Sequence, residues 1–488
     1  MSPPDGLGRS ATRGAAVTMS GQMVRLAVTG GGLVILARML SPEDFGLAAM
    51  ITALVGVANI LRDFGLSSAA VQSRQLTRAQ RDNLFWINAA LGLAFGLVVY
   101  VSAGFIADFY AQPRLESLTM ALASTFVLGG LSTQFRASLS RSMKFGSLAT
   151  IETISPAVAL VAAIIFASLG FGVWALVIQQ IVDALTGLIL SAAFARYVPG
   201  LPKRRADMSY LFRFGLNLTG TQLVTYASRN LDSVVVGSTL GPTALGLYSR
   251  AFQLLTLPMQ QISAPASRVA LPVLSKLQDD QKRFDAFILR GQTVLLHVVS
   301  AVFAIGAALG GPLIILVLGD QWIDAAPLFQ ILCIAGFGQA AGYSSYWIFI
   351  SNGLTSSHLR FTLLTSPAVV IAIFVGARWG AEGVAWGVSA FTLLTWPAGL
   401  IWLSRISEAP VLSLFLNGVR ALIGYGFASL IAFGAAQFTP PVPLLQIAAG
   451  LSGLLVAVTL ECWVWPAFRR DVFTILKTGS LLRAGQRP

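Results

Sequence analysis

The sequence predicts an all-α polytopic membrane protein, on the strength of its composition, the length of its apolar runs and the placement of its basic residues. Of the 488 residues, 55% are hydrophobic and only 11% are charged, whereas soluble domains carry about 25% charged residues. A transmembrane helix needs about 20 apolar residues, so this chain can form about fourteen of them joined by short loops. We therefore expect no large domain outside the bilayer.

Apolar runs of spanning length follow one another along the chain, and each predicts one transmembrane helix. Six precede a basic linker and lie near residues 17–39, 44–64, 83–107, 117–139, 147–169 and 172–194. Eight follow the linker and lie near residues 210–237, 243–265, 286–318, 325–350, 359–378, 381–404, 417–437 and 443–466. The first run shows no signal-peptide cleavage pattern, so we expect it to be retained as the first helix.

The net charge of +13 would suggest a nucleic-acid partner in a soluble protein. Here the basic residues form small groups between apolar runs, as membrane orientation signals do, so no nucleic-acid partner is expected. With the N-terminus in the cytoplasm, the inner connections hold most of the 33 Lys and Arg residues, and the outer ones hold only Arg38, Arg114 and Arg378. We expect an inner-membrane protein, and the positive-inside rule predicts that both of its termini are cytoplasmic.

A sequence repeat relates the two halves of the chain. At an offset of 200 residues the first and seventh expected helices share Gln22 with Gln222, Leu40 with Leu240, Pro42 with Pro242, Gly46 with Gly246 and Leu47 with Leu247. At an offset of 211 residues, Ser155–Val158 recurs as Ser366–Val369, which aligns the fifth and eleventh helices. An offset of six helices preserves orientation, so the repeat is parallel. We expect six-helix lobes over residues 1–205 and 206–410, then two additional helices and a basic cytoplasmic tail over 411–488.

Polar side chains within the apolar runs are candidates for function, because an ionisable group at bilayer depth is costly unless it meets a partner or a wet cavity. Gln22 and Arg25 lie on one face of the first expected helix, and Gln222, Thr225 and Arg229 lie on one face of the seventh. These stripes predict a central cavity in which arginines attract an anionic head group such as a pyrophosphate. The candidate substrate-binding residues are Arg25, Arg229, Arg250, Gln22, Gln222 and Thr225.

The same stripes have a second interpretation, which is helix packing. Arg229 could pair with Asp232, three residues further on, and hold neighbouring helices together. The acids Glu152, Asp183 and Asp232 are candidates for coupling transport to H⁺ or Na⁺, but they could equally neutralise the arginines. The residues leave both alternatives open.

Motifs for enzyme chemistry are missing from the sequence. It contains no HExxH, P-loop or GxSxG pattern and no paired acidic motif in a soluble loop. Cys333 and Cys462 both lie inside apolar runs without metal-ligand spacing. We therefore expect a protein that is not an enzyme and that binds neither a cofactor nor a metal.

Several short segments together resemble a known family. They are the stretch Leu36–Leu47, Asp63–Leu66 followed by Ala69, Val71 and Gln72, the stretch Leu245–Ala251, and Gly319–Asp320 with Trp322, Ala325 and Ala326. This ensemble is similar to Wzx-type polysaccharide exporters, the lipopolysaccharide and exopolysaccharide biosynthesis proteins of the multidrug/oligosaccharidyl-lipid/polysaccharide (MOP) flippase superfamily. The resemblance extends over most of residues 15–405.

The resemblance implies two six-helix lobes and translocation of undecaprenyl-diphosphate-linked oligosaccharide to the periplasmic leaflet. It implies cavity arginines at Arg25 and Arg229, and membrane lipids, a polysaccharide polymerase and chain-length proteins as partners. The alternatives are a lipid II flippase or a cation-coupled multidrug exporter of the same superfamily and, from another class, a membrane-embedded glycan polymerase or ligase. Multidrug exporters of the superfamily usually have twelve helices, and a polymerase or ligase would need a large periplasmic loop.

Overall fold

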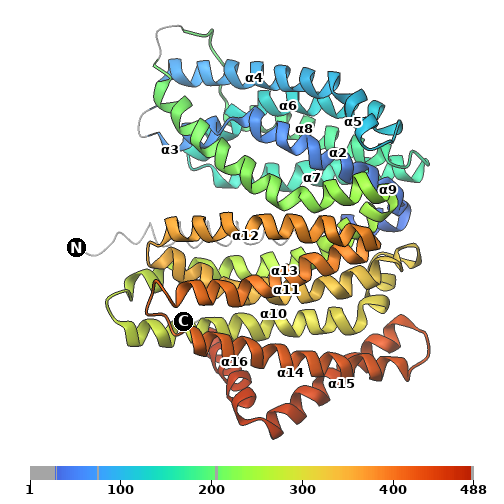
Figure 1. Ribbon diagram of the computed structural model, residues 1–488. Coiled ribbons are helices and arrows are strands. Elements are labelled where there is room, and N and C mark those ends of the chain that lie inside the picture. The colour runs from blue at the N-terminus through green and yellow to red at the C-terminus, as the bar shows by residue number, and fades with distance from the viewer. Residues whose placement is uncertain (1–27, 29, 74–75, 204–206, 485–488) are drawn as a thin grey trace. The chain divides into compact units, whose positions relative to one another are not determined.

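The protein is built from helices. The computed structural model describes residues 28, 30–73, 76–203 and 207–484 (Figure 1), and no strand occurs among them. Ten helical segments of this described part are long and apolar enough to cross a membrane. The predicted all-α polytopic class is therefore confirmed.

The count of fourteen spans stays a prediction. The ten segments cover eleven of the expected helices, because Thr355–Leu403 contains two of them. The expected helices 210–237 and 243–265 both lie in the long helix α9 (Ser209–Lys276), which is not among the ten. Most of the expected helix 17–39 lies outside the described residues, and its described end is helical over Gly30–Met39.

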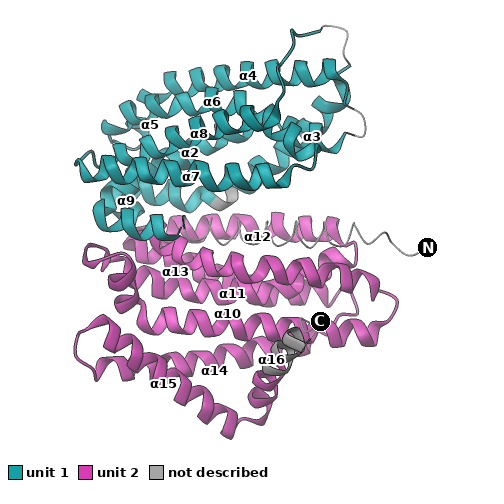
Figure 2. Ribbon diagram, turned by 180° about the vertical axis from the view of Figure 1, so that it is seen from behind, with its two compact units in different colours: residues 1–246 teal, residues 247–488 magenta. Residues whose placement is uncertain are grey.

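The chain divides into two compact units, which we call unit 1 and unit 2 (Figure 2). Unit 1 ends at Gly246 and unit 2 begins at Leu247. This boundary lies within α9, beyond residue 205, so the expected division into lobes at residue 205 stays a prediction.

In unit 1, helix α6 is central, and it packs against α2, α3, α4, α5, α7 and α8. The bounds of these helices are α2 Pro42–Asp63, α3 Leu66–Gln72, α4 Arg78–Val101, α5 Ala103–Phe109, α6 Arg114–Arg141, α7 Phe145–Ser168 and α8 Trp174–Ala195. The described part of unit 1 also contains the helix over Gly30–Met39 and the first section of α9.

Unit 2 is organised around α11, the most buried of the ten spans. Helix α11 packs against α10 and α13, and α10 also contacts α14, α15 and α16. The bounds are α10 Gln281–Val317, α11 Ala325–Ser351, α12 Thr355–Gly376, α13 Gly380–Leu403, α14 Val411–Gln437, α15 Pro443–Val464 and α16 Pro466–Ala484. The Asp471 carboxylate ties α16 to α14 and α10, since its Oδ2 lies 2.8 Å from Arg420 Nε and 3.6 Å from His297 Nε2.

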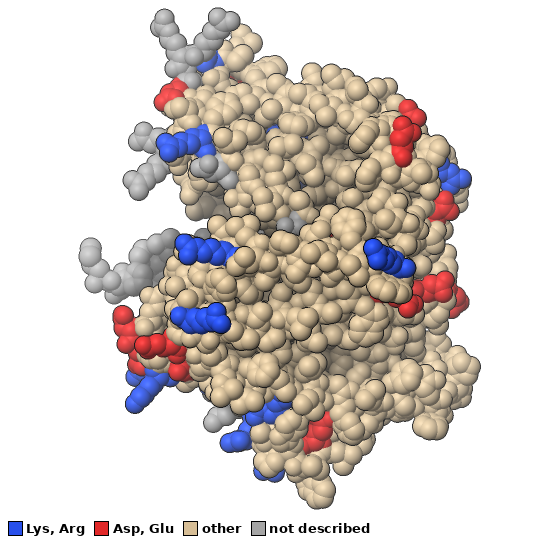
Figure 3. Space-filling model, in the orientation of Figure 1, with Lys and Arg blue, Asp and Glu red and all other residues tan. Residues whose placement is uncertain are grey.

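The surface of each unit is that of a membrane-embedded bundle. Figure 3 shows that charged side chains on this face lie at the helix ends, and that the wide surface between them is largely uncharged. Large apolar side chains such as Leu93 and Leu97 on α4 are more than half exposed. A row of exposed apolar side chains suits a lipid environment, because lipid is as apolar as the protein core.

Helix α9 breaks at Gly241, where the backbone turns with φ 86° and ψ −179°, a conformation that only glycine adopts readily. Pro242 follows this break, and Pro42, its counterpart in the repeat, begins α2. A Ser41–Asp44 capping box fixes the start of α2, with Asp44 N donating to Ser41 Oγ at 3.2 Å and Ser41 N donating to Asp44 Oδ2 at 3.0 Å.

The two copies of the repeat meet within unit 1 at Gly46 and Gly246, the glycines that correspond to each other in the repeat. A Cβ atom added at Gly46 would overlap the carbonyl oxygen of Pro242, and one added at Gly246 would overlap the carbonyl oxygen of Pro42. The contact is reciprocal, because each glycine lies against the proline carbonyl of the other copy of the repeat. One close backbone crossing therefore joins four of the recurring residues, Pro42, Gly46, Pro242 and Gly246.

Candidate functional site

The basic ends of α2, α4 and α6 gather at one end of unit 1, which the positive-inside rule predicts to be cytoplasmic. The chain turns sharply after α2, with left-handed backbone at Phe64 (φ 45°) and Gly65 (φ 60°), and then forms the short helix α3. Gly65 lies against the backbone of Gly215 in α9, where an added Cβ would lie 2.8 Å from the Gly215 oxygen. This turn brings α3 beside the end of α6, and two cavities open there.

The larger of these two cavities, which we call the Arg62–Arg136 cavity, has a volume of about 740 Å³. Its walls come from α2, α3, α6, α7 and the start of α9, and ten of its fourteen lining residues are polar. The lining residues are Arg62, Asp63, Ser67, Ser68, Val71, Gln72, Ser132, Thr133, Arg136, Ala137, Ser140, Leu148, Glu152 and Phe214. Its volume lies within the range of about 300–1,000 Å³ that is typical of small-ligand sites.

Both arginines of this cavity lie against glycines on neighbouring helices. A Cβ atom added at Gly129 in α6 would overlap Arg62 Nη1, and one added at Gly187 in α8 would lie 2.6 Å from Arg136 Nη2. The missing side chains at Gly129 and Gly187 thus give the guanidinium groups room to lie against helix backbone. Larger residues at these positions would displace them.

The charges in the cavity are only partly satisfied by the protein. The Nε atoms of Arg62 and Arg136 are buried and have no hydrogen-bond partner among the described residues, and the two like charges repel each other. Two carboxylates share the cavity: Asp63, whose Oδ2 accepts a hydrogen bond from Ser67 Oγ at 2.9 Å, and the exposed Glu152. Each guanidinium group thus keeps an Nε donor without a partner among the described residues, and the two carboxylates supply negative charge when no ligand is bound. A ligand with two negative charges suits such a pair of guanidinium groups.

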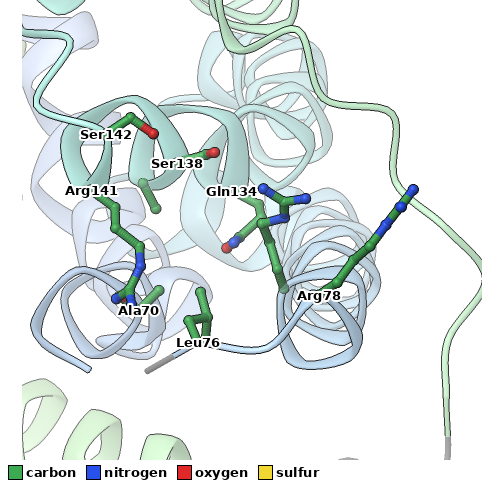
Figure 4. A pocket seen from close by; sticks show the side chains of 9 residues that line it. Ala70, Leu76, Arg78, Gln134, Ser138, Arg141 and Ser142 are labelled. Carbon is green, nitrogen blue, oxygen red and sulfur yellow. The ribbon is translucent and has the colours of Figure 1, made fainter. Parts of the chain in front are cut away.

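The smaller cavity, which we call the Gln134 cavity, has a volume of about 410 Å³ and lies between the ends of α3, α4 and α6. Figure 4 shows Gln134, Ser138 and Arg141 on α6 and Arg78 extending outward from the start of α4. The lining residues are Ala70, Leu76, Arg78, Arg81, Gln134, Ala137, Ser138, Arg141 and Ser142. Three arginines and no carboxylate therefore line this cavity.

Next to the Gln134 cavity, the start of α4 binds the segment that follows α8. Trp86 Nε1 donates to the Gly200 carbonyl at 2.9 Å, and Asn83 exchanges two hydrogen bonds with the Lys203 backbone, at 2.7 and 2.8 Å. Tyr197 donates its hydroxyl proton to the buried Asp82 carboxylate. Burial raises the pKa of Tyr197, and the Asp82 bond raises it further, so the hydroxyl stays a donor at any physiological pH.

Few of the predicted site residues can be placed in a cavity. Gln22 and Arg25 lie outside the described residues, and Arg229 is in α9 with its side chain outside the described part. Gln222 is half-buried and Thr225 is exposed, with Thr225 Oγ1 donating to the Thr221 carbonyl at 2.8 Å. The central cavity between stripes of the first and seventh helices therefore stays a prediction.

The remaining predicted residues fall in separate places. Arg250 is in unit 2, where its Nη1 donates to Gln253 Oε1 at 2.6 Å. Asp183 is half-buried in α8, and Asp232 is buried in α9, where its Oδ1 accepts from Ser233 N at 2.8 Å. Of the predicted residues, Glu152 lines one of the two arginine-containing cavities of unit 1 that are described above.

Arg62 and Arg136 are among the basic residues of the expected inner connections, and they were not predicted as site residues. A signal was available, because Ser132, Arg136 and Ser140 recur every four residues and form the same kind of polar stripe that drew attention to the first helix. The stripe lies at a helix end, where basic residues are expected for membrane topology alone, so it did not indicate a binding site.

Comparison with known proteins identifies the family. The family model described as polysaccharide biosynthesis protein matches residues 35–327, more than half of the chain. The chain belongs to this family. The resemblance stated from the sequence is thereby confirmed, and the match includes both the Arg62–Arg136 cavity and the reciprocal glycine crossing.

Relatives of this family member match over most of both chains. The lipopolysaccharide biosynthesis protein WzxC of Escherichia coli is 26% identical over 371 residues, which cover 74% of each chain. The succinoglycan biosynthesis transport protein ExoT of Rhizobium meliloti is 28% identical over 428 residues, covering 85% of each chain. The teichuronic acid biosynthesis protein TuaB of Bacillus subtilis is 24% identical over 390 residues, covering 78% of this chain and 80% of the relative.

Solved structures show the same fold at low sequence identity. The lipid II flippase MurJ in an inward closed conformation superposes with a TM-score of 0.68 at 15% identity, covering 95% of this chain and all of that chain. An inward-facing multidrug resistance MATE family transporter of the MOP superfamily has a TM-score of 0.61 at 14% identity, covering 82% and 99%. This family member is thus a multi-pass membrane protein with the fold of these transporters.

Proposed function

We propose that this protein is a flippase that translocates undecaprenyl-diphosphate-linked oligosaccharide repeat units across the bacterial inner membrane for lipopolysaccharide or exopolysaccharide biosynthesis. The observation that carries the proposal is the family match together with relatives aligned over about three quarters or more of their length, whose names all concern polysaccharide biosynthesis or its transport. On this account the protein is not an enzyme.

The diphosphate is the part of the substrate that the described residues can recognise. Arg62 and Arg136 both line one cavity, and each has a buried Nε without a partner among the described residues. Guanidinium pairs with phosphate oxygens through two parallel hydrogen bonds. The hydroxyls of Ser132, Thr133 and Ser140 line the same cavity and can hydrogen-bond to the first sugars. The lipid tail stays in the bilayer.

Glu152 and Asp63 give the cavity a way to release its cargo. In the empty cavity these carboxylates balance the two guanidinium charges, and a bound diphosphate takes their place as the counter-ion. Loss of the arginine counter-charge favours uptake of a proton or a cation by a carboxylate displaced in this way, so Glu152 is the candidate for ion coupling that this geometry favours. Asp183 and Asp232 stay candidates from the sequence.

The alternatives fit the cavity less well. A cationic drug would be repelled by Arg62 and Arg136, which argues against cation-coupled multidrug export. A lipid II flippase would also bind a diphosphate, but the likeness to MurJ is one of fold alone at 15% identity, whereas the relatives by sequence act in polysaccharide pathways. A polymerase or ligase would need catalytic groups that the sequence does not offer.

The proposal also specifies the membrane topology of the protein, its two lobes and its partners. Both termini lie in the cytoplasm, so the Arg62–Arg136 cavity faces the leaflet in which lipid-linked repeat units are made. Residues 1–205 and 206–410 act as the two lobes, and 411–488 add two helices and a cytoplasmic tail. Besides lipid-linked substrate and membrane lipids, a polysaccharide polymerase and chain-length proteins are the expected partners.

Deletion of the gene tests the proposed function. We expect loss of the surface polysaccharide and accumulation of the lipid-linked repeat unit in the cytoplasmic leaflet, both restored by the wild-type gene. Accumulation in the periplasmic leaflet would instead indicate a polymerase or ligase. Undiminished polymer with no accumulated lipid-linked intermediate would contradict the proposal.

A further inference from the structure

The Gln134 cavity has no part in the transport proposal, and its chemistry points to a ligand of its own. Arg78, Arg81 and Arg141 contribute three positive charges to its walls, and none of its nine lining residues is acidic. The Asp82 carboxylate, which does not line the cavity, interacts with Arg78 and Arg81 but already accepts the Tyr197 hydroxyl bond. The cavity therefore has an excess of positive charge.

Gln134 supplies the second, independent observation. Its side chain lines the cavity and is 0% exposed, yet neither Oε1 nor Nε2 has a hydrogen-bond partner among the described residues. Buried amide groups in proteins nearly always have partners, and each exception calls for an explanation. A ligand in the cavity that accepts a hydrogen bond from Nε2 explains this one.

Two of the three arginines, Arg81 and Arg141, are held in place by the surrounding protein. Arg81 stacks over the Tyr197 ring, with Cζ 3.9 Å from the ring centroid, and its Nε is buried without a partner among the described residues. Arg141 donates from Nη1 to the Ala70 carbonyl at 3.0 Å and to the Ser73 carbonyl, at the end of α3. Fixed guanidinium groups lose little side-chain freedom on binding, which favours affinity.

We propose that the Gln134 cavity binds a phosphate group at the end of unit 1 that is predicted to be cytoplasmic. Phosphate offers several acceptor oxygens and negative charge, which match the guanidinium donors, Gln134 Nε2 and the hydroxyls of Ser138 and Ser142. The phosphate belongs either to the head group of an anionic lipid of the inner leaflet or to a soluble phosphate compound. This site adjoins the Arg62–Arg136 cavity at Ala137 but is lined by other arginines, and the proposal does not depend on transport.

Thermal unfolding of the purified full-length protein tests the proposal in two arms. In neutral detergent, inorganic phosphate is titrated against sodium chloride at equal ionic strength. In the other arm, nanodiscs of phosphatidylcholine are compared with nanodiscs that also contain phosphatidylglycerol. We expect the unfolding midpoint to rise by about 2–4 °C in at least one arm, because a ligand that binds only the folded state stabilises it. The arm that responds identifies the source of the phosphate, and no rise in either arm would overturn the proposal.

Two variants locate the effect. Arg81→Gln removes one charge and is expected to weaken the apparent affinity about tenfold or more. Gln134→Leu removes the unpartnered amide, so it is expected to raise the ligand-free midpoint and also to lose the ligand-induced rise, a combination that a purely structural role would not produce.

Two control variants test whether the stabilisation is specific to the Gln134 cavity. Arg62→Gln alters the neighbouring cavity, and Arg114→Gln alters an exposed arginine that lies 3.4 Å from Glu43 in unit 1. Both are expected to keep a ligand-induced rise, and Arg62→Gln keeps it without the contribution of the neighbouring cavity. A rise in the Arg62→Gln protein that the further change Gln134→Leu does not reduce would place the ligand elsewhere and overturn the proposal. If Arg81→Gln does not fold, Gln134→Leu decides.

Discussion

Gly46→Ala and Gly246→Ala are each expected to destabilise the protein by about 3 kcal/mol, at the upper end of the usual range for overpacking. A single methyl group at either position would overlap a proline carbonyl oxygen, of Pro242 or of Pro42. Backbone cannot move aside as a flexible side chain can, so the two segments must separate. The measurement is the unfolding midpoint in detergent, together with the amount of protein in the membrane.

The reciprocal geometry of this crossing makes the double variant informative. The Cβ position at Gly246 also lies 3.2 Å from the Gly46 backbone nitrogen, so a separation forced by one alanine makes room for part of the other. We expect the double variant to be clearly less destabilised than the sum of the single variants.

Gly220→Ala in α9 is the matched control, because nothing lies within 4 Å of its Cβ position. It is expected to stabilise the protein slightly, as alanine does in place of glycine in a helix. Single variants as stable as Gly220→Ala would show that the two repeat segments do not cross as described.

Arg62→Ala and Arg136→Ala are expected to lower transport by tenfold or more each, while protein abundance is unchanged. A hydrogen bond to a charged group contributes about 1.5–3 kcal/mol, and every 1.4 kcal/mol corresponds to about a factor of ten. The lysine variants keep the charge but lose the paired hydrogen bonds, so intermediate transport is expected. The measurement is surface polysaccharide and accumulated lipid-linked repeat unit in a deletion strain that expresses each variant.

Gly129→Val tests whether the position of the Arg62 guanidinium matters, because this change leaves the charge of Arg62 in place. The new side chain must displace the Arg62 guanidinium, so transport should fall although both arginines are present. Arg114→Ala, at an exposed ion pair with Glu43, is the control and should transport normally. Full complementation by Arg62→Ala and Arg136→Ala would reject this cavity as the diphosphate site.

The fold was largely predictable from the sequence because lipid imposes simple rules. An apolar run must become a helix, and its length is set by the bilayer, so α4 and α6 lie close to the expected 83–107 and 117–139. The break at Gly241 separates the two expected helices that α9 joins. The repeat alignment placed Pro42 with Pro242 and Gly46 with Gly246, although it could not show that these residues touch.

The candidate site was less predictable, because it depends on which helices become neighbours. Arg62 reaches its position through the turn at Gly65 and the space left by Gly129 on another helix. Neither feature can be inferred from hydropathy. A basic residue at a helix end can serve either membrane orientation or ligand binding. For Arg62, the cavity that it shares with Arg136 and Glu152 indicates ligand binding.

The central claim is that this protein moves a diphosphate-linked glycan across a membrane, and a reconstituted translocation assay tests it most directly. The purified protein is placed in liposomes that contain a fluorescent polyprenyl-diphosphate-linked glycan, and an impermeant quencher reports the fraction exposed on the outside. We predict rapid movement between leaflets with the wild-type protein, and movement no faster than in empty liposomes with the Arg62→Ala/Arg136→Ala double variant. Wild-type liposomes that behave like empty ones would contradict the account.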